Sequence, residues 1–234
     1  EPPVSDQELI EMIDIGGPTM IRSAAKNHKD VIVLTSPSQY EGIIAKLREA
    51  EGDPSAIGIK ERAKLALESF KGTAAYDTAV SNELESRLKN EKIPSMINIA
   101  TEIGSNLRYG ENPHQPASFY PNGGEPSGLA AAIQHGGKPL SYNNYLDLDG
   151  ALRLAQNIIH SCPNHNHGCV VIKHTNPCGA AVDSSQSQAW KSALASDPES
   201  AFGCVIAFTK EVELDTAIAI GDHFFECMIA PGYH

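Results

Sequence analysis

Short β-branched runs alternate with longer stretches of helical periodicity along this chain, and this alternation restricts the fold more than any other feature. Residues 31–34, 169–173 and 203–208 are apolar runs of strand length. Apolar residues recur at helical spacing in several of the segments outside these runs. Helices and strands that alternate with short joints pack as helix layers on a sheet. The sequence therefore predicts an α/β fold.

Helix-start signals locate the helices of the N-terminal part. Ser5 to Glu8 and Ser38 to Glu41 both fit a capping box, in which a serine and an acidic residue three positions later satisfy each other's backbone N–H groups. Pro18 suits the first turn of a further helix. Residues 59–88 keep a helical pattern, and Gly72 predicts a break between two helices there.

A polar, extended stretch at residues 89–94 predicts a domain boundary, with domains at 1–92 and 93–234. Beyond it, residues 105–126 are rich in Gly, Pro and Asn and predict a long loop. A loop of that length inside a compact domain is more often functional than not. Residues 140–159 return to a helical pattern.

Charge and hydropathy exclude several classes of function. The formal net charge is −11 and the chain has no run of Lys or Arg, which argues against a nucleic-acid binder. No apolar stretch approaches the length of a membrane span. The five cysteines are odd in number and show no C-x-x-C spacing, which favours a reducing compartment. We therefore expect a cytoplasmic protein, with an organelle as the alternative if the source is a plant.

The clearest candidate for chemistry is residues 173–179, Lys-His-Thr-Asn-Pro-Cys-Gly, at the end of a predicted strand. Histidine is the side chain that most often serves as a general base, which makes His174 a candidate, and Lys173 beside it could stabilise developing negative charge. Neighbouring strand residues point to opposite faces, so both reach one pocket only if the strand bends at the turn predicted at Asn176-Pro177. The same residues also fit a solvated strand end, and spacing alone leaves both interpretations open.

Two further segments could bind an anion. Arg108 and Tyr109 in the long loop supply a guanidinium that matches phosphate and a stacking ring, although composition favours a tight turn with a surface arginine and a tyrosine that covers the core. Gly16 and Gly17 precede a predicted helix, where backbone N–H groups can cradle an anion, and Lys26 follows two turns later. Gly-Gly-Pro also suits any turn.

A cluster of possible zinc ligands lies between the predicted helix and strand, at His160, Cys162, His165, His167 and Cys169. Zinc sites usually pair ligands from separated elements, and this spacing is too cramped for four ligands on one ion. We therefore expect a surface connection and no metal site.

In this order, the segments resemble a known family, the bifunctional purine biosynthesis proteins, which join an IMP cyclohydrolase to an AICAR formyltransferase. The matching stretches are Ile13–Gly17, Ala24–His28, Leu107–Gln115, Leu140–Asn144, Lys173–Gly179, Ser200–Gly203 and Ile229–Pro231.

The resemblance implies an α/β architecture in two parts. Residues 1–92 would be the C-terminal part of a cyclohydrolase domain of the methylglyoxal-synthase type. Residues 93–234 would be the first part of a formyltransferase domain similar to the cytidine-deaminase fold. Family members are much longer, so we expect this chain to be an internal piece that is inactive by itself.

The resemblance also implies the reaction and the partners. A formyl group passes from the co-substrate 10-formyltetrahydrofolate to the 5-amino group of AICAR, and the product FAICAR then closes to IMP with loss of water. No metal is required, and family members act as homodimers.

Residue roles follow from the same resemblance. His174 would transfer the proton of the attacking amine with Lys173 as its cationic partner, and Asp14 and Lys26 would serve the cyclohydrolase. The implied substrate-binding residues are Arg108, Tyr109, Asn144, Glu226, His114, Gly16 and Gly17. Of these, Arg108 and Tyr109 would hold chiefly the phosphate end, and Asn144 the base or its carboxamide.

Two alternatives remain open at this stage. One is a formyltransferase whose cyclohydrolase part is only structural, which a cyclisation assay would separate. The other is a nucleotide-binding module without turnover, which would bind AICAR equally well when His174 is replaced by alanine.

Overall fold

The computed structural model describes residues 4–88, 96–121, 125–162, 164 and 166–234, and these form a mixed α/β chain. Two compact units divide it, Glu1–Thr101 and Glu102–His234. The predicted boundary at residue 92 lies outside the described residues. Within the described ranges, no helix is both long and apolar enough to span a membrane.

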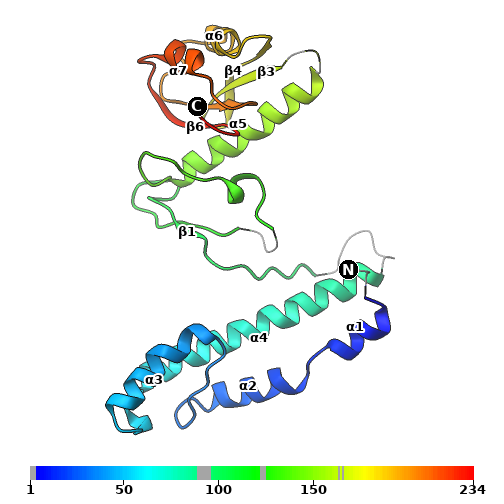
Figure 1. Cartoon of the computed structure of the whole chain (residues 1–234), viewed down its shortest axis with the longest axis vertical. Helices are drawn as coiled ribbons and strands as arrows, with labels where there is room; N and C mark the ends of the chain where they lie inside the picture. Colours follow the sequence, from blue (N-terminus) through cyan, green and yellow to red (C-terminus); the bar gives the residue numbers. More distant parts are fainter. Residues whose placement is uncertain (1–3, 89–95, 122–124, 163, 165) are drawn as a thin grey trace. The chain divides into compact units, whose positions relative to one another are not determined.

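The first unit consists of helices over its described residues. They are α1 (Asp6–Met12), α2 (Gly16–Lys26), α3 (Tyr40–Glu49) and α4 (Ile59–Leu88), with short 3-10 turns η1 (Pro37–Gln39) and η2 (Pro54–Ala56). Helix α2 packs along α4 (Figure 1). A small apolar cluster joins α3 to the start of α4 through Ile43, Ile57 and Leu65.

The strand predicted at residues 31–34 is wrong. Ile32 and Leu34 pack against the cluster around Ile43 with no regular secondary structure. A strand needs a neighbour to pair its backbone N–H and C=O groups, and no described residue of this unit is in a strand. These apolar side chains are therefore partly buried by packing on the helices, without forming a strand.

Of the two predicted capping boxes, one is confirmed and the other forms at a different position. The Ser5 hydroxyl accepts from the Glu8 N–H at 3.3 Å, and the box predicted there is confirmed. The second box is formed by Ser36 and Gln39, two positions earlier than predicted. Pro37 explains the shift, because its fixed φ favours the first helical position directly after a capping residue.

Gly72 does not break α4, which is continuous over 30 residues. A glycine inside a helix costs about 1 kcal/mol relative to alanine. It keeps its N–H group, however, so the hydrogen-bond ladder continues through it.

The second unit is built on a four-stranded sheet in the order β4-β3-β5-β6. The strands are β3 (His167–Lys173), β4 (Asn176–Asp183), β5 (Cys204–Phe208) and β6 (Phe225–Ile229). β3 is antiparallel to both β4 and β5, and β6 is parallel to β5. The strands predicted at 169–173 and 203–208 are confirmed.

Helices cover both faces of this sheet (Figure 1). Helix α5 (Tyr142–Ser161) lies on one face, and α6 (Gln186–Ser196) and α7 (Leu214–Ile220) lie on the other. The long segment before α5 contains β1 (Ser105–Asn106), β2 (Ser118–Phe119) and the 3-10 turn η3 (Gly128–Ala131). The helix predicted at 140–159 is confirmed, and so is the long loop over its described residues, 105–121 and 125–126.

Side chains of the two central strands, β3 and β5, point alternately to the two faces of the sheet and so contribute to two separate apolar clusters. Val170 and Ile172 pack against α5, whereas Val171 packs against α6 beside the buried Trp190. Because successive strand residues point to opposite faces, the uninterrupted apolar run of β3 is what a strand covered on both sides requires.

Gly179 of β4 is the position where this packing is tightest. A Cβ there would overlap the backbone carbonyl of Ala193 in α6. Gly179→Ala should therefore lower the free energy of unfolding by about 2–3 kcal/mol, measured by urea denaturation. Gly150→Ala is the matched control: no atom lies within 4 Å of its Cβ, and alanine in a helix should raise stability by about 0.5–1 kcal/mol. Equal effects of the two changes would contradict this packing.

Candidate functional site

The loop that carries Arg108 and Tyr109 is attached to the start of α5 by its backbone. The Arg108 N–H donates to the Leu140 carbonyl at 2.9 Å, and the Tyr142 N–H donates to the Tyr109 carbonyl at 3.0 Å. Both side chains therefore stand at the N-terminal end of α5, although their loop lies more than thirty residues earlier in the sequence.

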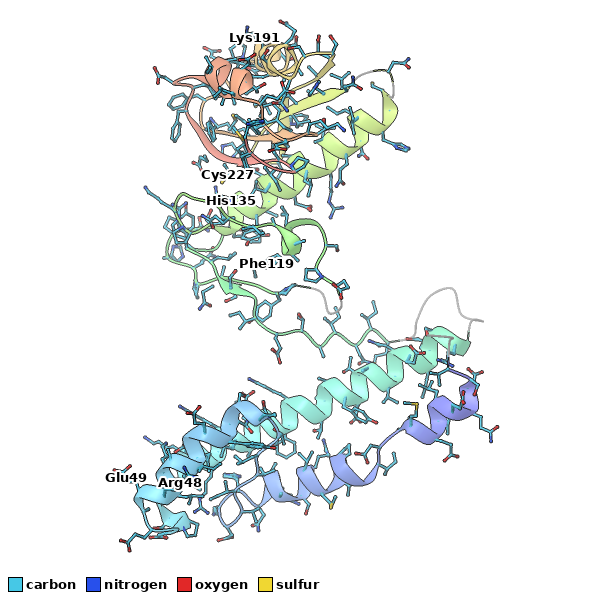
Figure 2. The ribbon with its side chains drawn as sticks, in the orientation of Figure 1. Arg48, Glu49, Phe119, His135, Lys191 and Cys227 are labelled. Atoms are coloured by element: carbon cyan, nitrogen blue, oxygen red, sulfur yellow. The ribbon has the colours of Figure 1, made fainter. Side chains whose placement is uncertain are left out.

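Side-chain contacts strengthen this attachment. The ring of Phe119, labelled in Figure 2, stacks on Tyr145 of α5 with centroids 4.7 Å apart. The Asn143 side chain donates to the Glu111 carbonyl at 3.1 Å. The long loop is thus an ordered support for the residues that it presents.

Asn144 lies at the centre of the candidate site. Its side chain is buried, and its Oδ1 accepts from the Ser141 N–H at 3.0 Å and the Ser141 hydroxyl at 2.9 Å. Its Nδ2 donates to Glu226 Oε2 at 2.8 Å, and Arg108 Nη2 approaches its Oδ1 at 3.5 Å. Three residues predicted as substrate-binding are therefore brought together from a loop, a helix and an edge strand.

The charges of this group remain accessible. Arg108 and Glu226 are exposed, and the Arg108 guanidinium lies over the Tyr109 ring at 4.9 Å from its centre. A guanidinium beside a phenol can bind a phosphate, while a carboxylate beside an amide can bind the polar edge of a heterocycle. The arrangement therefore suits an anionic ligand with a polar ring.

The β3–β4 hairpin turn holds His174. The structure places the turn at His174 and Thr175, whose φ angles are 52° and 62°, and β4 begins at Asn176. The turn predicted at Asn176-Pro177 is therefore wrong. Two-residue hairpin loops need positive φ to match the strand twist, and Pro177 cannot adopt it. As part of an edge strand, Pro177 is tolerated without a backbone N–H.

Lys173 is held on the face of β3 that α6 covers. Its Nζ donates to the Phe202 carbonyl at 2.6 Å. No hydrogen bond joins Lys173 to His174 in the part of the chain that the structure describes. The alternation expected of strand neighbours does not apply to this pair, because β3 ends at Lys173 and His174 has a left-handed backbone in the turn.

The residues predicted in the first unit are dispersed. Asp14 accepts from the Gly17 N–H at 3.0 Å and so caps α2 with its own carboxylate. Gly16 and Gly17 are the first residues of that helix instead of a loop before it. Lys26 ends the helix, about 15 Å from its start. This unit therefore does not bring Asp14 and Lys26 together.

Among the described residues, neither His114 nor the cysteine–histidine segment hydrogen-bonds to Arg108, Asn144 or Glu226. His114 is exposed in a turn closed by a 2.7 Å hydrogen bond from the Gly110 N–H to the Gln115 carbonyl. His165 lies outside the described residues, and His167 Nε2 is 3.8 Å from Glu213. Among the described residues, no three His, Cys, Asp or Glu side chains are grouped to hold a metal ion.

Asp147 is a site residue that the sequence reasoning missed. Its Oδ1 accepts from the Thr175 N–H at 2.6 Å, which ties the hairpin turn to α5. Asp147 follows Asn144 by three positions, a spacing that puts two side chains on one helix face. That spacing could have indicated Asp147 as a further site residue from the sequence alone.

Comparison with known proteins identifies the lineage. The family model of the AICARFT/IMPCHase bienzyme matches residues 24–234. Three similar relatives are each called bifunctional purine biosynthesis protein PurH. Identity is 41% to that of Persephonella marina, 45% to that of Dinoroseobacter shibae and 47% to that of Prochlorococcus marinus subsp. pastoris.

These alignments cover 97%, 95% and 97% of this chain. The chain in turn spans only 42%, 41% and 43% of the length of those relatives. Among solved structures, the crystal structure of ForH is similar at 37% identity and a TM-score of 0.31, over 36% of this chain and 45% of that one.

Cys227, labelled in Figure 2, adjoins the candidate site on β6. Burial, which has the largest effect, and the neighbouring Glu226 carboxylate together raise the pKa of its thiol to about 11, and Arg108 partly opposes both. At pH 8 about one such thiol in a thousand is ionised, against about one in four for an ordinary thiol.

Iodoacetamide should therefore alkylate Cys227 slowly at pH 8, and the rate should rise about tenfold per pH unit up to pH 10, because only the thiolate reacts. Mass spectrometry of the labelled peptide measures this rate. The same peptide in urea is the control and should react as an ordinary thiol. Equal rates in the folded and unfolded protein at pH 8 would contradict the assignment.

Proposed function

The chain belongs to the AICARFT/IMPCHase bienzyme family, and we propose on that premise that this protein acts in de novo purine biosynthesis. Its reactions are formyl transfer from 10-formyltetrahydrofolate to AICAR, which gives FAICAR, and cyclodehydration of FAICAR to IMP. The observation that carries this proposal is the convergence of Arg108, Asn144 and Glu226 at the start of α5, the helix to which the His174 turn is also tied.

The nucleotide is assigned to the Arg108 end of this group. The Arg108 guanidinium would bind the phosphate, with Tyr109 beside it as a hydroxyl donor and stacking ring. Glu226 would accept from the polar edge of the base, and the Asn144 amide that it contacts would set its orientation. His114, exposed in the same loop, is assigned to the periphery of this binding surface.

The chemistry is assigned to the strand end. The 5-amino nitrogen of AICAR attacks the formyl carbon, His174 takes the proton that this nitrogen loses, and N10 of tetrahydrofolate leaves with a proton. An aromatic amine is a poor nucleophile, so positioning and proton removal dominate the barrier. Lys173 would stabilise the negative charge that develops on the formyl oxygen. These groups supply the reaction without a metal ion.

The first unit is assigned to ring closure. We place residues 1–92 in the C-terminal part of a domain of the methylglyoxal-synthase type, and residues 93–234 in the first part of a formyltransferase domain similar to the cytidine-deaminase fold. Asp14 and Lys26 would serve the cyclohydrolase, with Gly16 and Gly17 near its ligand. The protein would act as a cytoplasmic homodimer.

Formyl transfer is tested by His174→Ala in the complete product of the gene, with tetrahydrofolate release as the readout. We expect kcat to fall about 10²- to 10⁴-fold, because general base catalysis contributes that much, while the Kd for AICAR stays the same. His160→Ala, an exposed histidine on the last turn of α5, is the control.

Each outcome of that assay has a meaning. AICAR binding without transfer in the unaltered protein would make it a nucleotide-binding module. Transfer that survives in His174→Ala would remove the base assignment while leaving the enzyme assignment intact.

Ring closure is tested separately by supplying FAICAR and following IMP. Lys26→Ala should reduce cyclisation at least about tenfold, as expected for loss of a group that acts on the reacting atoms, and should leave formyl transfer unchanged. Lys29→Ala is the matched control because it is an exposed lysine three residues away. No cyclisation in the unaltered protein would favour a formyltransferase with a purely structural first unit.

A further inference from the structure

The turn that carries His174 has a backbone conformation that its residues disfavour. His174 and Thr175 have φ angles of 52° and 62°, in the left-handed region that suits glycine or asparagine. Thr175 is β-branched, and such residues are outliers there. Strained turns of this kind persist only when the surrounding structure holds them, and they cluster at functional sites.

Within the described part of the chain, one hydrogen bond from outside the hairpin reaches the backbone of this turn. The Thr175 N–H donates to Asp147 Oδ1 at 2.6 Å, a short hydrogen bond to a carboxylate. The turn's own bonds are local: the Thr175 hydroxyl and the Asn176 side chain donate to the His174 carbonyl at 2.6 and 2.9 Å. Asp147 therefore ties the turn directly to α5.

Asp147 stands on a rigid part of the fold. It precedes Leu148, which is buried against the sheet, and it lies one helical turn after the buried Asn144. Side chains three positions apart on a helix have Cβ atoms about 5–6 Å apart. One face of α5 thus carries both the amide that contacts Glu226 and the carboxylate that holds the His174 turn.

We propose that Asp147 is a positioning residue for formyl transfer: through the Thr175 N–H it holds the His174 turn in register with the nucleotide-binding group at Asn144. The inference rests on the proposed function of His174. Asp147 itself does not contact substrate in this role. It acts only by fixing the position of the turn backbone from which the His174 side chain extends.

The first test is kinetic and uses the complete protein. Asp147→Ala should lower kcat about 10- to 100-fold, because a displacement of about 1 Å can cost that much, with little change in the KM for AICAR. Asp147→Asn should retain more activity, since its amide oxygen can still accept from Thr175. Asp149→Ala is the matched control on the same helix, where Asp149 pairs with the exposed Arg153 at 2.8 Å.

Two double variants separate positioning from a loss of folding. In the His174→Ala background, Asp147→Ala should cause no further fall in kcat, because the group that it positions is gone. Thr175→Gly should restore part of the loss in Asp147→Ala, because glycine adopts positive φ without strain. A further fall in the first case together with no rescue in the second would overturn the proposal.

Amide hydrogen exchange gives a readout that does not need activity. The Thr175 N–H should exchange about tenfold faster or more in Asp147→Ala than in the unaltered chain, since a hydrogen bond to a charged acceptor is lost. If the unaltered protein transfers no formyl group, the proposed function fails while this measurement still decides whether Asp147 holds the turn. Unchanged Thr175 exchange, or a wild-type kcat in Asp147→Ala, would refute the inference.

Discussion

The packing of α5 across the sheet is the contact on which the candidate site depends. Leu148, Ala151 and Ala155 lie against Val170 and Val205 in one buried cluster, so the helix cannot slide or rotate without opening that cluster. Its first turn carries the Ser141–Asn144 capping box, whose two residues are buried. The loop with Arg108 then docks on that first turn through backbone hydrogen bonds. The position of each residue of the site therefore depends on the packing of α5 against the sheet.

Helix α5 therefore does what no single motif could do. On one face of the helix, Asn144 contacts Glu226 of an edge strand, and Asp147 binds the backbone of a hairpin turn. Binding and proton transfer need different residue types. Asn144 and Asp147 are three positions apart on the helix, so the side chains that support the two functions lie next to each other. The first unit has no comparable support among its described residues, and its two proposed catalytic residues stand at opposite ends of α2.

Sequence patterns predicted the secondary structure well where short-range interactions decide it. The apolar runs of β3 and β5 and the periodicity of α5 are strong because burial on a sheet demands them. The errors share a reason. Residues 31–34 have strand composition, but no described residue of their unit forms a strand to pair with them, and Gly72 weakens a helix without removing a hydrogen bond. The turn moved to His174 and Thr175 because strand twist, not the turn preference of Asn176 and Pro177, selects the hairpin loop.

The sequence by itself determined which residue types could do chemistry: a histidine and a lysine at a strand end, an arginine and a tyrosine in a long loop, and an order of motifs similar to one enzyme family. Only the tertiary structure decided that Arg108, Asn144 and Glu226 meet, and that Asp147 holds the His174 turn. The physical reason is the separation along the chain over which each interaction acts. Capping and periodicity act over a few residues, whereas contacts between residues 28, 36 or 82 positions apart exist only once α5 has packed on the sheet.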